Sequence, residues 1–399
     1  MFNQIRLSAW STGVRSKLSL PLRVELWNGQ HVDFSSEPPR VTIRIPDAAA
    51  VRYLLSPSLY NLGTAYVEGA IDVSGRASDM IAVVGALAAS SVPRNRLAQA
   101  LRKIVHTRES DAAAVRYHYD VSNDFYGAWL DPGMVYSCAY FEDGNETLAE
   151  AQLKKIDHIL NKIRLRPGHT LLDIGCGWGA LAIRAAQRYG ARCVGITLSE
   201  NQVRLARQQV ERAGMQHLVK IRLQDYRDLA GKFDRITSVG MFEHVGTHHL
   251  TAYFSRINAL LAPDGVAMNH GLTTTSTRSK AAPFGGGEFI QRYVFPRGEL
   301  AHLGTVLRAM QEGGLEALDV ENLRRHYART CAIWTDNFES NAEQIKLLTD
   351  PKKFRIWHVY LAGCSYAFAN DWISLYQIVC SKAGRDPGAI PWSRRFMYA

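Results

Sequence analysis

The sequence predicts an α/β fold in which a doubly wound, Rossmann-like domain follows a smaller α+β domain. Short apolar segments alternate with helical periods after residue 166, a glycine-rich turn follows the first of them, and the first ninety residues show a hairpin pattern instead. With 399 residues, 47% of them hydrophobic, the chain is long enough for two cores. We expect an N-terminal domain at 1–92, a basic helical linker at 93–116 and the larger domain at 117–399.

The larger domain is predicted from apolar segments that are short enough to be strands and are separated by helical periods. The expected strands span 170–174, 191–196, 218–223, 235–240 and 266–272. Such alternation is typical of a mostly parallel sheet with helices on both faces, which explains why the strands are apolar throughout.

The N-terminal domain is predicted to contain a small curled sheet. In RVELWNGQHVDF (23–34), apolar and polar residues alternate on both sides of Asn28-Gly29, which is a strong hairpin signal. Further strands are expected at 40–45 and 69–75, and helices near 47–55 and 78–89. The stretch RVTIRIPDAAAVRYLLSPSLYNLGTAYVEGAIDVSG resembles the sterol carrier protein family. The resemblance implies a domain that handles an acyl chain, and the alternative is a domain that only packs.

The chain is basic, with a formal net charge of +10 and a pI near 9.3. Such a balance suits nucleic acid or an anionic membrane, although an ordinary basic enzyme fits as well. Residues 94–108 interleave arginines and a lysine with apolar residues and predict either an amphipathic helix on lipid or a solvated linker. No signal peptide is visible, and the apolar segment Tyr360–Cys380, interrupted by Asn370 and Asp371, predicts a buried helix rather than a transmembrane one.

The six cysteines are scattered and form no CxxC pair. This spacing argues against a disulfide framework and against a metal site of the zinc type. Reduced thiols in a cytosolic enzyme are the simplest interpretation.

The sharpest motif is LLDIGCGWG at 171–179, where a strand ends, three glycines follow and a helix begins. Glycine allows the sharp turn and lets a ligand approach the backbone. The spacing is GxGxG, not the GxGxxG of dinucleotide folds, and it resembles the first motif of class I S-adenosylmethionine methyltransferases. The resemblance implies cofactor contacts from Leu171, Leu172, Asp173, Ile174, Gly175, Cys176, Gly177, Trp178 and Gly179.

Two later strand ends are predicted to complete the cofactor site, because ligands of such sheets bind at the carboxyl ends of the strands. The second strand runs into GITLSENQ, whose candidates are Thr197, Leu198, Ser199 and Gln202. Many methyltransferases have an acidic residue there for the ribose hydroxyls. The third strand runs into QDYRD, whose candidates are Asp225, Tyr226 and Arg227. The alternative is that these loops only turn the chain.

The end of the fourth strand reads VGMFEHVG. The Asp/Asn-Pro-Pro-aromatic motif of adenine N-methyltransferases is absent there, which weakens a nucleic-acid substrate. Together with YSCAYF at 136–141, MNHGL at 268–272 and RRHYARTCAIW at 324–334, the motifs resemble the cyclopropane fatty acid synthase family, including the mycolic acid cyclopropane synthases. The match runs from about Tyr117 to the C-terminus.

The resemblance implies transfer of the S-adenosylmethionine methyl group to the cis double bond of an acyl chain, usually in a phospholipid. A bound bicarbonate then removes a proton and a cyclopropane ring closes. The implied bicarbonate pocket consists of Cys138 through its backbone N–H, Glu243, His270, Leu272 and Tyr327, with Leu272 where isoleucine is frequent. Tyr136 and Ser137 are implied as further cofactor contacts.

Other functions stay open from the sequence. A C-methyltransferase that leaves a methyl-branched or methylene-bearing chain would keep the cofactor site, and a lipid-binding protein would keep only the fold. RNA methylation is a distant alternative, so no nucleic-acid partner is expected. The family resemblance suggests a homodimer. Because the acyl chains of a bilayer are not presented to water, we expect a cytoplasmic enzyme that is peripheral on the inner membrane face and attracted to anionic lipid.

Overall fold

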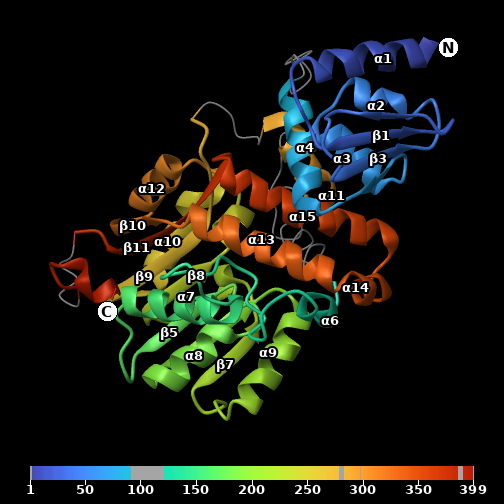
Figure 1. The fold of residues 1–399 in the computed structure, drawn as a ribbon. Helices are drawn as coiled ribbons and strands as arrows, with labels where there is room; N and C mark the ends of the chain where they lie inside the picture. Colours follow the sequence, from blue (N-terminus) through green and yellow to red (C-terminus); the bar gives the residue numbers. More distant parts are fainter. Residues whose placement is uncertain (1, 91–120, 278–282, 297, 385–389, 399) are drawn as a thin grey trace.

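The computed structural model describes residues 2–90, 121–277, 283–296, 298–384 and 390–398. The described residues form two sheets, one of seven strands in the larger domain and one of four strands in the N-terminal domain (Figure 1). The α/β class predicted for the larger domain is therefore confirmed. The basic segment 94–108 lies outside the described residues.

The seven strands lie in the order β10-β11-β9-β8-β5-β6-β7. Their bounds are β5 Thr170–Ile174, β6 Arg192–Thr197, β7 Val219–Leu223, β8 Phe233–Val239, β9 Leu261–Thr274, β10 Leu315–Asn322 and β11 Ile373–Lys382. Strands β5 to β9 pair in parallel, and β11 is antiparallel to both β9 and β10. The chain order reverses between β5 and β8, which is the switch point where such sheets bind ligands.

Helices cover both faces of this sheet. One face carries α7 Leu148–Lys162, α8 Ala180–Tyr189 and α9 Glu200–Arg212, and the other carries α10 Leu250–Leu260 and α12 Leu303–Glu312. Successive residues of a strand point to opposite faces, so Leu171 packs in the first layer and Leu172 in the second. Both are fully buried, which explains why the strands read as continuous apolar segments.

The prediction of one buried helix over 360–380 is wrong. Helix α15 (Pro351–Ala369) ends before Asn370, and β11 begins at Ile373. Asp371 makes the turn with a φ of 58°, a left-handed conformation that aspartate tolerates better than most residues. Because β11 is buried on both faces, its apolar sequence lacks the alternation that would distinguish a strand from a helix.

The N-terminal sheet has the order β2-β1-β3-β4, and the predicted hairpin is confirmed. Val24 lies opposite Val32 across the turn, where Gly29 has a φ of 80°. The strands are β1 Leu22–Leu26, β2 His31–Asp33, β3 Val41–Ile45 and β4 Asp72–Ser74, and the helices are α1 Phe2–Arg15, α2 Val51–Leu55, α3 Leu59–Val67 and α4 Ala77–Ser90. The helix expected near 47–55 is shorter than predicted, since α2 begins only at Val51.

A helical layer lies between the N-terminal domain and the large sheet (Figure 1). It contains α11 Gly286–Tyr293, α13 Arg324–Ser340 and α15, while α6 Asn123–Gly127 and α14 Ala342–Leu348 lie at its end. Helices α3 and α4 of the N-terminal domain contact α11, α13 and α15 directly. The two domains therefore share an interface built on the helical layer.

Candidate active site

The carboxyl ends of β5, β6, β8 and β9 open into a cavity of about 1800 Å³. Its lining comes from the loops after these strands, from residues 134–137, from α15 and from the N-terminal domain. A site for one small ligand has about 300–1,000 Å³. The cavity is therefore large enough for a cofactor and a long substrate together.

The glycine loop after β5 forms a cradle for a ligand. Gly175 N and Cys176 N both donate to Ile196 O, at 2.9 and 3.0 Å, and tie the loop to the end of β6. Gly175 and Gly177 have φ values of 80° and 54°, which favour glycine. A Cβ on Gly177 would meet no atom within 4 Å, so this backbone is open to a ligand. The residues present thus fit a cofactor of the S-adenosylmethionine type.

Most of the predicted cofactor residues line this cavity. They are Tyr136, Ser137, Asp173, Ile174, Gly175, Cys176, Gly177, Trp178, Thr197, Leu198, Gln202, Asp225 and Tyr226. Five others do not line it, namely Leu171, Leu172, Gly179, Ser199 and Arg227. The two leucines are core residues, Gly179 and Ser199 are the caps that begin α8 and α9, and Arg227 binds Asp225 at 2.6 Å. These five residues therefore hold the loops in place through core packing, helix caps and an ion pair, and do not face the cavity.

Buried polar contacts fix the strand ends. Thr237 Oγ1 donates to Asp173 Oδ1 at 2.8 Å, and Thr197 Oγ1 donates to Gln202 Oε1 at 2.6 Å. Burial raises the pKa of Asp173 to about 6, even though the Thr237 hydroxyl stabilises its charged form.

Lys155 is a cavity residue that the sequence analysis missed. It lies on α7, which begins with a capping box between Thr147 and Glu150. Its side chain is buried, and Nζ donates to Ser137 Oγ at 2.6 Å but forms no ion pair with a carboxylate among the described residues. Burial lowers its pKa to about 8. The helical spacing of Gln152, Lys155 and Lys162 was the available signal, since all three are buried beside the apolar row of the helix.

Glu243 lies on the short helix η3 (Phe242–His244) that follows β8. Only 9% of the residue is exposed, and burial raises the pKa of its carboxyl to about 7. The backbone N–H groups of Glu243 and Leu272 partly oppose this shift. Oε2 is buried without a hydrogen-bond partner in the described part of the chain. A polar atom of this kind is satisfied by a ligand or water.

His270 on β9 is 1% exposed, and burial holds its pKa well below the usual range, so the ring is neutral. Its Nδ1 lies 3.3 Å from Gln377 Nε2 on β11. With the amide nitrogen donating to Nδ1, the single proton of the neutral ring lies on Nε2. Nε2 is buried and has no partner among the described residues, which makes it a donor available to a ligand.

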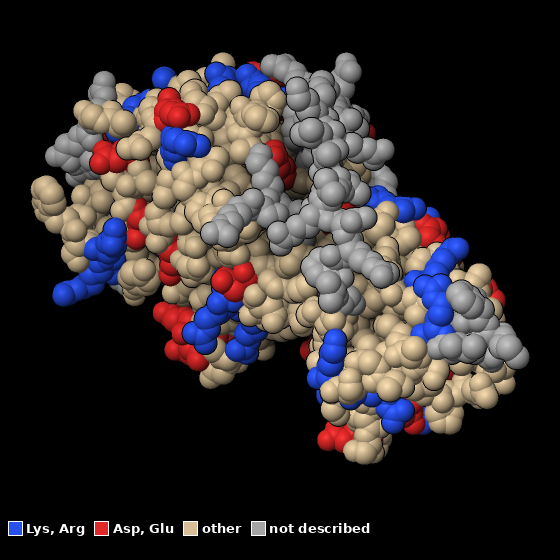
Figure 2. Space-filling view, turned by 90° about the horizontal axis from the view of Figure 1, so that it is seen from above, with Lys and Arg blue, Asp and Glu red and all other residues tan. Residues whose placement is uncertain are grey.

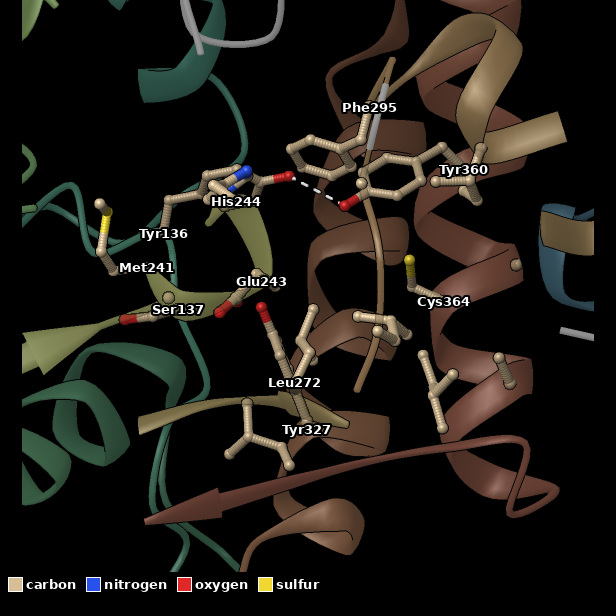
Figure 3. A pocket seen from close by; sticks show the side chains of 18 of the residues that line it. Tyr136, Ser137, Met241, Glu243, His244, Leu272, Phe295, Tyr327, Tyr360 and Cys364 are labelled. Carbon is tan, nitrogen blue, oxygen red and sulfur yellow. Dashed lines mark hydrogen bonds between the residues drawn. The ribbon is translucent and has the colours of Figure 1, made fainter. Parts of the chain in front are cut away.

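Tyr327 on α13 packs face to face with Phe368, with ring centroids 4.6 Å apart. Its hydroxyl and the Glu243 carboxylate point toward one another, and the Leu272 side chain lies beside them (Figure 3). Glu243, His270, Leu272 and Tyr327 all line the cavity. Four of the five predicted bicarbonate residues therefore line the same cavity.

Cys138, the fifth, is fully buried and is not among the lining residues described. Its thiol donates to Ala139 O at 3.2 Å, and burial raises its pKa well above the usual range. A buried neutral thiol fits the expectation that this cysteine is not a nucleophile.

Comparison with known proteins gives two family matches. Residues 106–378 match the mycolic acid cyclopropane synthetase family, and residues 9–96 match a domain of unknown function. A probable fatty acid methyltransferase of Pseudomonas putida is 44% identical over 96% of this chain and 97% of its own length. Cyclopropane mycolic acid synthase 1 of Mycobacterium tuberculosis is 37% identical over 68% of this chain and 97% of its own length. The crystal structure of mycolic acid cyclopropane synthase CmaA1 with SAH and CTAB superposes with a TM-score of 0.65 at 36% identity, covering 68% of this chain and 98% of that one.

Proposed function

Because the chain belongs to the mycolic acid cyclopropane synthetase family, we propose that it transfers the methyl group of S-adenosylmethionine to the cis double bond of an unsaturated (phospho)lipid acyl chain and closes a cyclopropane ring, with bicarbonate as general base. The coarser activity, that of a methyltransferase acting on lipids, follows from the family. The finer one rests on the buried acceptor Glu243 Oε2 and the buried donor His270 Nε2, neither of which has a partner among the described residues. Bicarbonate is a small ion that both donates and accepts, so it suits this pair.

The cofactor would lie on the glycine loop, with Asp225 and Tyr226 at one end and Ser137 and Lys155 at the other. S-adenosylmethionine supplies an electrophilic methyl group. Lys155 presents a buried ammonium that forms no ion pair within 4 Å among the described residues, and we assign it to the cofactor's carboxylate. CmaA1 holds SAH in its crystal structure, which supports the same type of ligand here.

The chain's own residues would provide a dry site and a place for the base. An alkene is a weak nucleophile, so its position must be fixed and water excluded. Ring closure requires one proton to leave the transferred methyl group, and the electron pair of that C–H bond forms the last ring bond. The His270 Nε2 proton and the Tyr327 hydroxyl would donate to the oxygens of the base. Glu243, with a pKa of about 7, would accept from its O–H group.

The alternative is a fatty acyl C-methyltransferase that does not close the ring. It is favoured by the name of the Pseudomonas putida relative, a probable fatty acid methyltransferase that matches over nearly its whole length. The same cofactor site would serve it, but the product would be methyl-branched or would carry a methylene group.

One experiment separates the two. The protein is incubated with S-adenosylmethionine and vesicles of a cis-monounsaturated phospholipid, with and without bicarbonate, and the acyl products are analysed by mass spectrometry and proton NMR. A gain of one CH2 with upfield ring protons, lost without bicarbonate, supports the synthase. The same gain with an alkene signal retained supports the alternative, and no gain with bound cofactor contradicts both.

The substrate suggests docking on a membrane surface. Among the described residues, no helix has the length and apolarity needed to cross a bilayer. Basic and acidic side chains are interspersed on the face seen in Figure 2, where the residues drawn in grey are not described. We ascribe membrane attraction to the net charge of +10. The homodimer stays a prediction, which light scattering would test.

A further inference from the structure

We propose that the N-terminal domain forms the far end of the substrate site and binds the methyl-terminal part of the acyl chain. The inference rests on the proposed function for the identity of the ligand. We call this part of the cavity the N-terminal pouch, defined by Ile43, Leu62, Ile71, Met80, Ile81 and Val84. No role is assigned to the domain by its family match.

The pouch is continuous with the candidate active site. Residues of β3, α3 and α4 line the same cavity as Glu243 and His270. The residues between them come from α11 and α15, among them Phe289, Tyr360 and Cys364. Figure 3 shows Tyr360 and Cys364 projecting from α15 toward the side of the cavity where Glu243 and Tyr327 lie. A chain that passes the reactive centre therefore has a path toward the N-terminal domain.

The chemistry of the lining changes along this path. The charged lining residues, such as Lys155, Asp173 and Glu243, all come from the larger domain. The described lining residues of the N-terminal domain include no charged side chain. Their one hydroxyl is that of Tyr66, which lies 3.3 Å from His358 Nδ1. Such a lining suits an alkyl chain and excludes a headgroup, so the methyl end must point into the pouch.

The pouch wall is held in place by polar contacts across the interface. His358 Nε2 lies 2.9 Å from Glu339 Oε1, which also accepts from the backbone N–H of Ala77 at 2.7 Å. Glu68 accepts from Lys352 at 2.9 Å and from Tyr293 at 2.8 Å. These contacts join α3 and α4 to α11, α13 and α15, so the pouch keeps its place relative to the active site.

The helices of the two domains also approach each other closely at the interface. A Cβ on Gly85 of α4 would lie only 2.8 Å from the Tyr366 hydroxyl of α15. A Cβ on Gly63 of α3 would lie 3.0 Å from the Phe289 ring of α11. The two domains thus leave no room for a larger side chain at either glycine, and the cavity is lined by both domains.

The family match begins at residue 106, after all the pouch residues. The pouch is therefore an addition to the catalytic domain that this chain shares with the cyclopropane mycolic acid synthases. Its distance from the reactive centre would limit how many carbons follow the double bond. We infer that the N-terminal domain determines which double-bond positions are used.

The test measures binding of free cis-monounsaturated fatty acids that share one carboxyl-to-double-bond length and differ in methyl-side length. The full-length protein is used with SAH present, and affinity is read by calorimetry. Val84→Phe fills the pouch, and Ala82→Phe, at an exposed position of the same helix, is the matched control. Each methylene excluded from the pouch is expected to weaken binding about fourfold.

For the wild type and Ala82→Phe, affinity should rise with methyl-side length up to the same limiting length. For Val84→Phe the affinity should stop rising at a shorter chain. Val84→Ala should move the limiting length of the wild type to longer chains, which keeps the test valid if the phenylalanine variant does not fold. Identical length dependence in all variants, or no binding by the wild type, would overturn the proposal. Length-dependent binding without any methylated product would refute the proposed function and leave the pouch intact.

Discussion

Replacing Glu243 with glutamine should stabilise the cofactor-free protein at alkaline pH while it removes ring closure. Burial raises the pKa of this carboxyl from 4.5 to about 7 in the folded state. A raised carboxyl pKa contributes stability that is fully present below about pH 4.5 and is lost as the pH rises through about 7. The full loss is about 3 kcal/mol, of which about 2 kcal/mol falls between about pH 5.5 and about pH 8. Glutamine has no proton to lose, so the variant avoids this loss.

The assay is urea unfolding, followed by tryptophan fluorescence, of both proteins at these two pH values. The free energy of unfolding of Glu243→Gln, relative to wild type, should be higher at the alkaline pH than at the acidic pH by about 2 kcal/mol. Glu343→Gln is the control, because that side chain is 89% exposed and its ion pair with Lys346 contributes little. An equal difference between Glu243→Gln and wild type at both pH values would refute the reasoning that burial opposes this charge.

Three further predictions concern Lys155, Cys138 and the net charge of the chain. Lys155→Met should weaken S-adenosylmethionine binding at least about tenfold, as measured by calorimetry. The folded pKa of Lys155 is depressed to about 8, so its contribution to the stability of the fold is lost as the pH falls through that value. The cofactor-free variant should therefore also have a higher melting temperature than the wild type at neutral pH. A variant that binds the cofactor normally would contradict the assignment. Cys138→Ser should keep substantial activity in the vesicle assay, since the thiol faces Ala139 O and not the cavity, and complete loss in a folded protein would count against this view. Anionic vesicles should bind the protein better than neutral ones in a sedimentation assay, with binding weakened by salt, and equal binding to both would refute an electrostatic attraction.

The glycine loop and the strands around it could be predicted because their signals are local. The motif at 171–179 contains its own turn chemistry, and the strand β5 that precedes it spans Thr170–Ile174 as predicted. The hairpin around Asn28 and Gly29 was predictable for the same reason. In each case a few adjacent residues determine the backbone conformation.

The missed features depend on contacts between distant segments. Strand β11 is buried on both faces by elements far away in the sequence, and Gln377, which orients His270, was missed with it. Lys155 lies on the amphipathic helix α7, where polar residues are buried next to the apolar row, and the apolar row alone dominates the sequence pattern. The continuity of the cavity with the N-terminal domain has no local signal at all, because it depends on how α4 packs against α15.

The shifted ionisable groups distinguish the two ends of the cavity, to which we assign separate roles. Burial shifts the pKa of four groups of the larger domain toward the neutral form, namely those of Asp173, Glu243, His270 and Lys155. Ligands that complement these groups must therefore stabilise the fold when they bind, by an amount that grows with concentration. The pouch has no such groups among its described residues, so a ligand there gains only from apolar burial. The polar end can therefore hold the reacting atoms in place while the apolar end selects the length of chain beyond them, which allows the chemistry and the substrate range to be changed by separate substitutions.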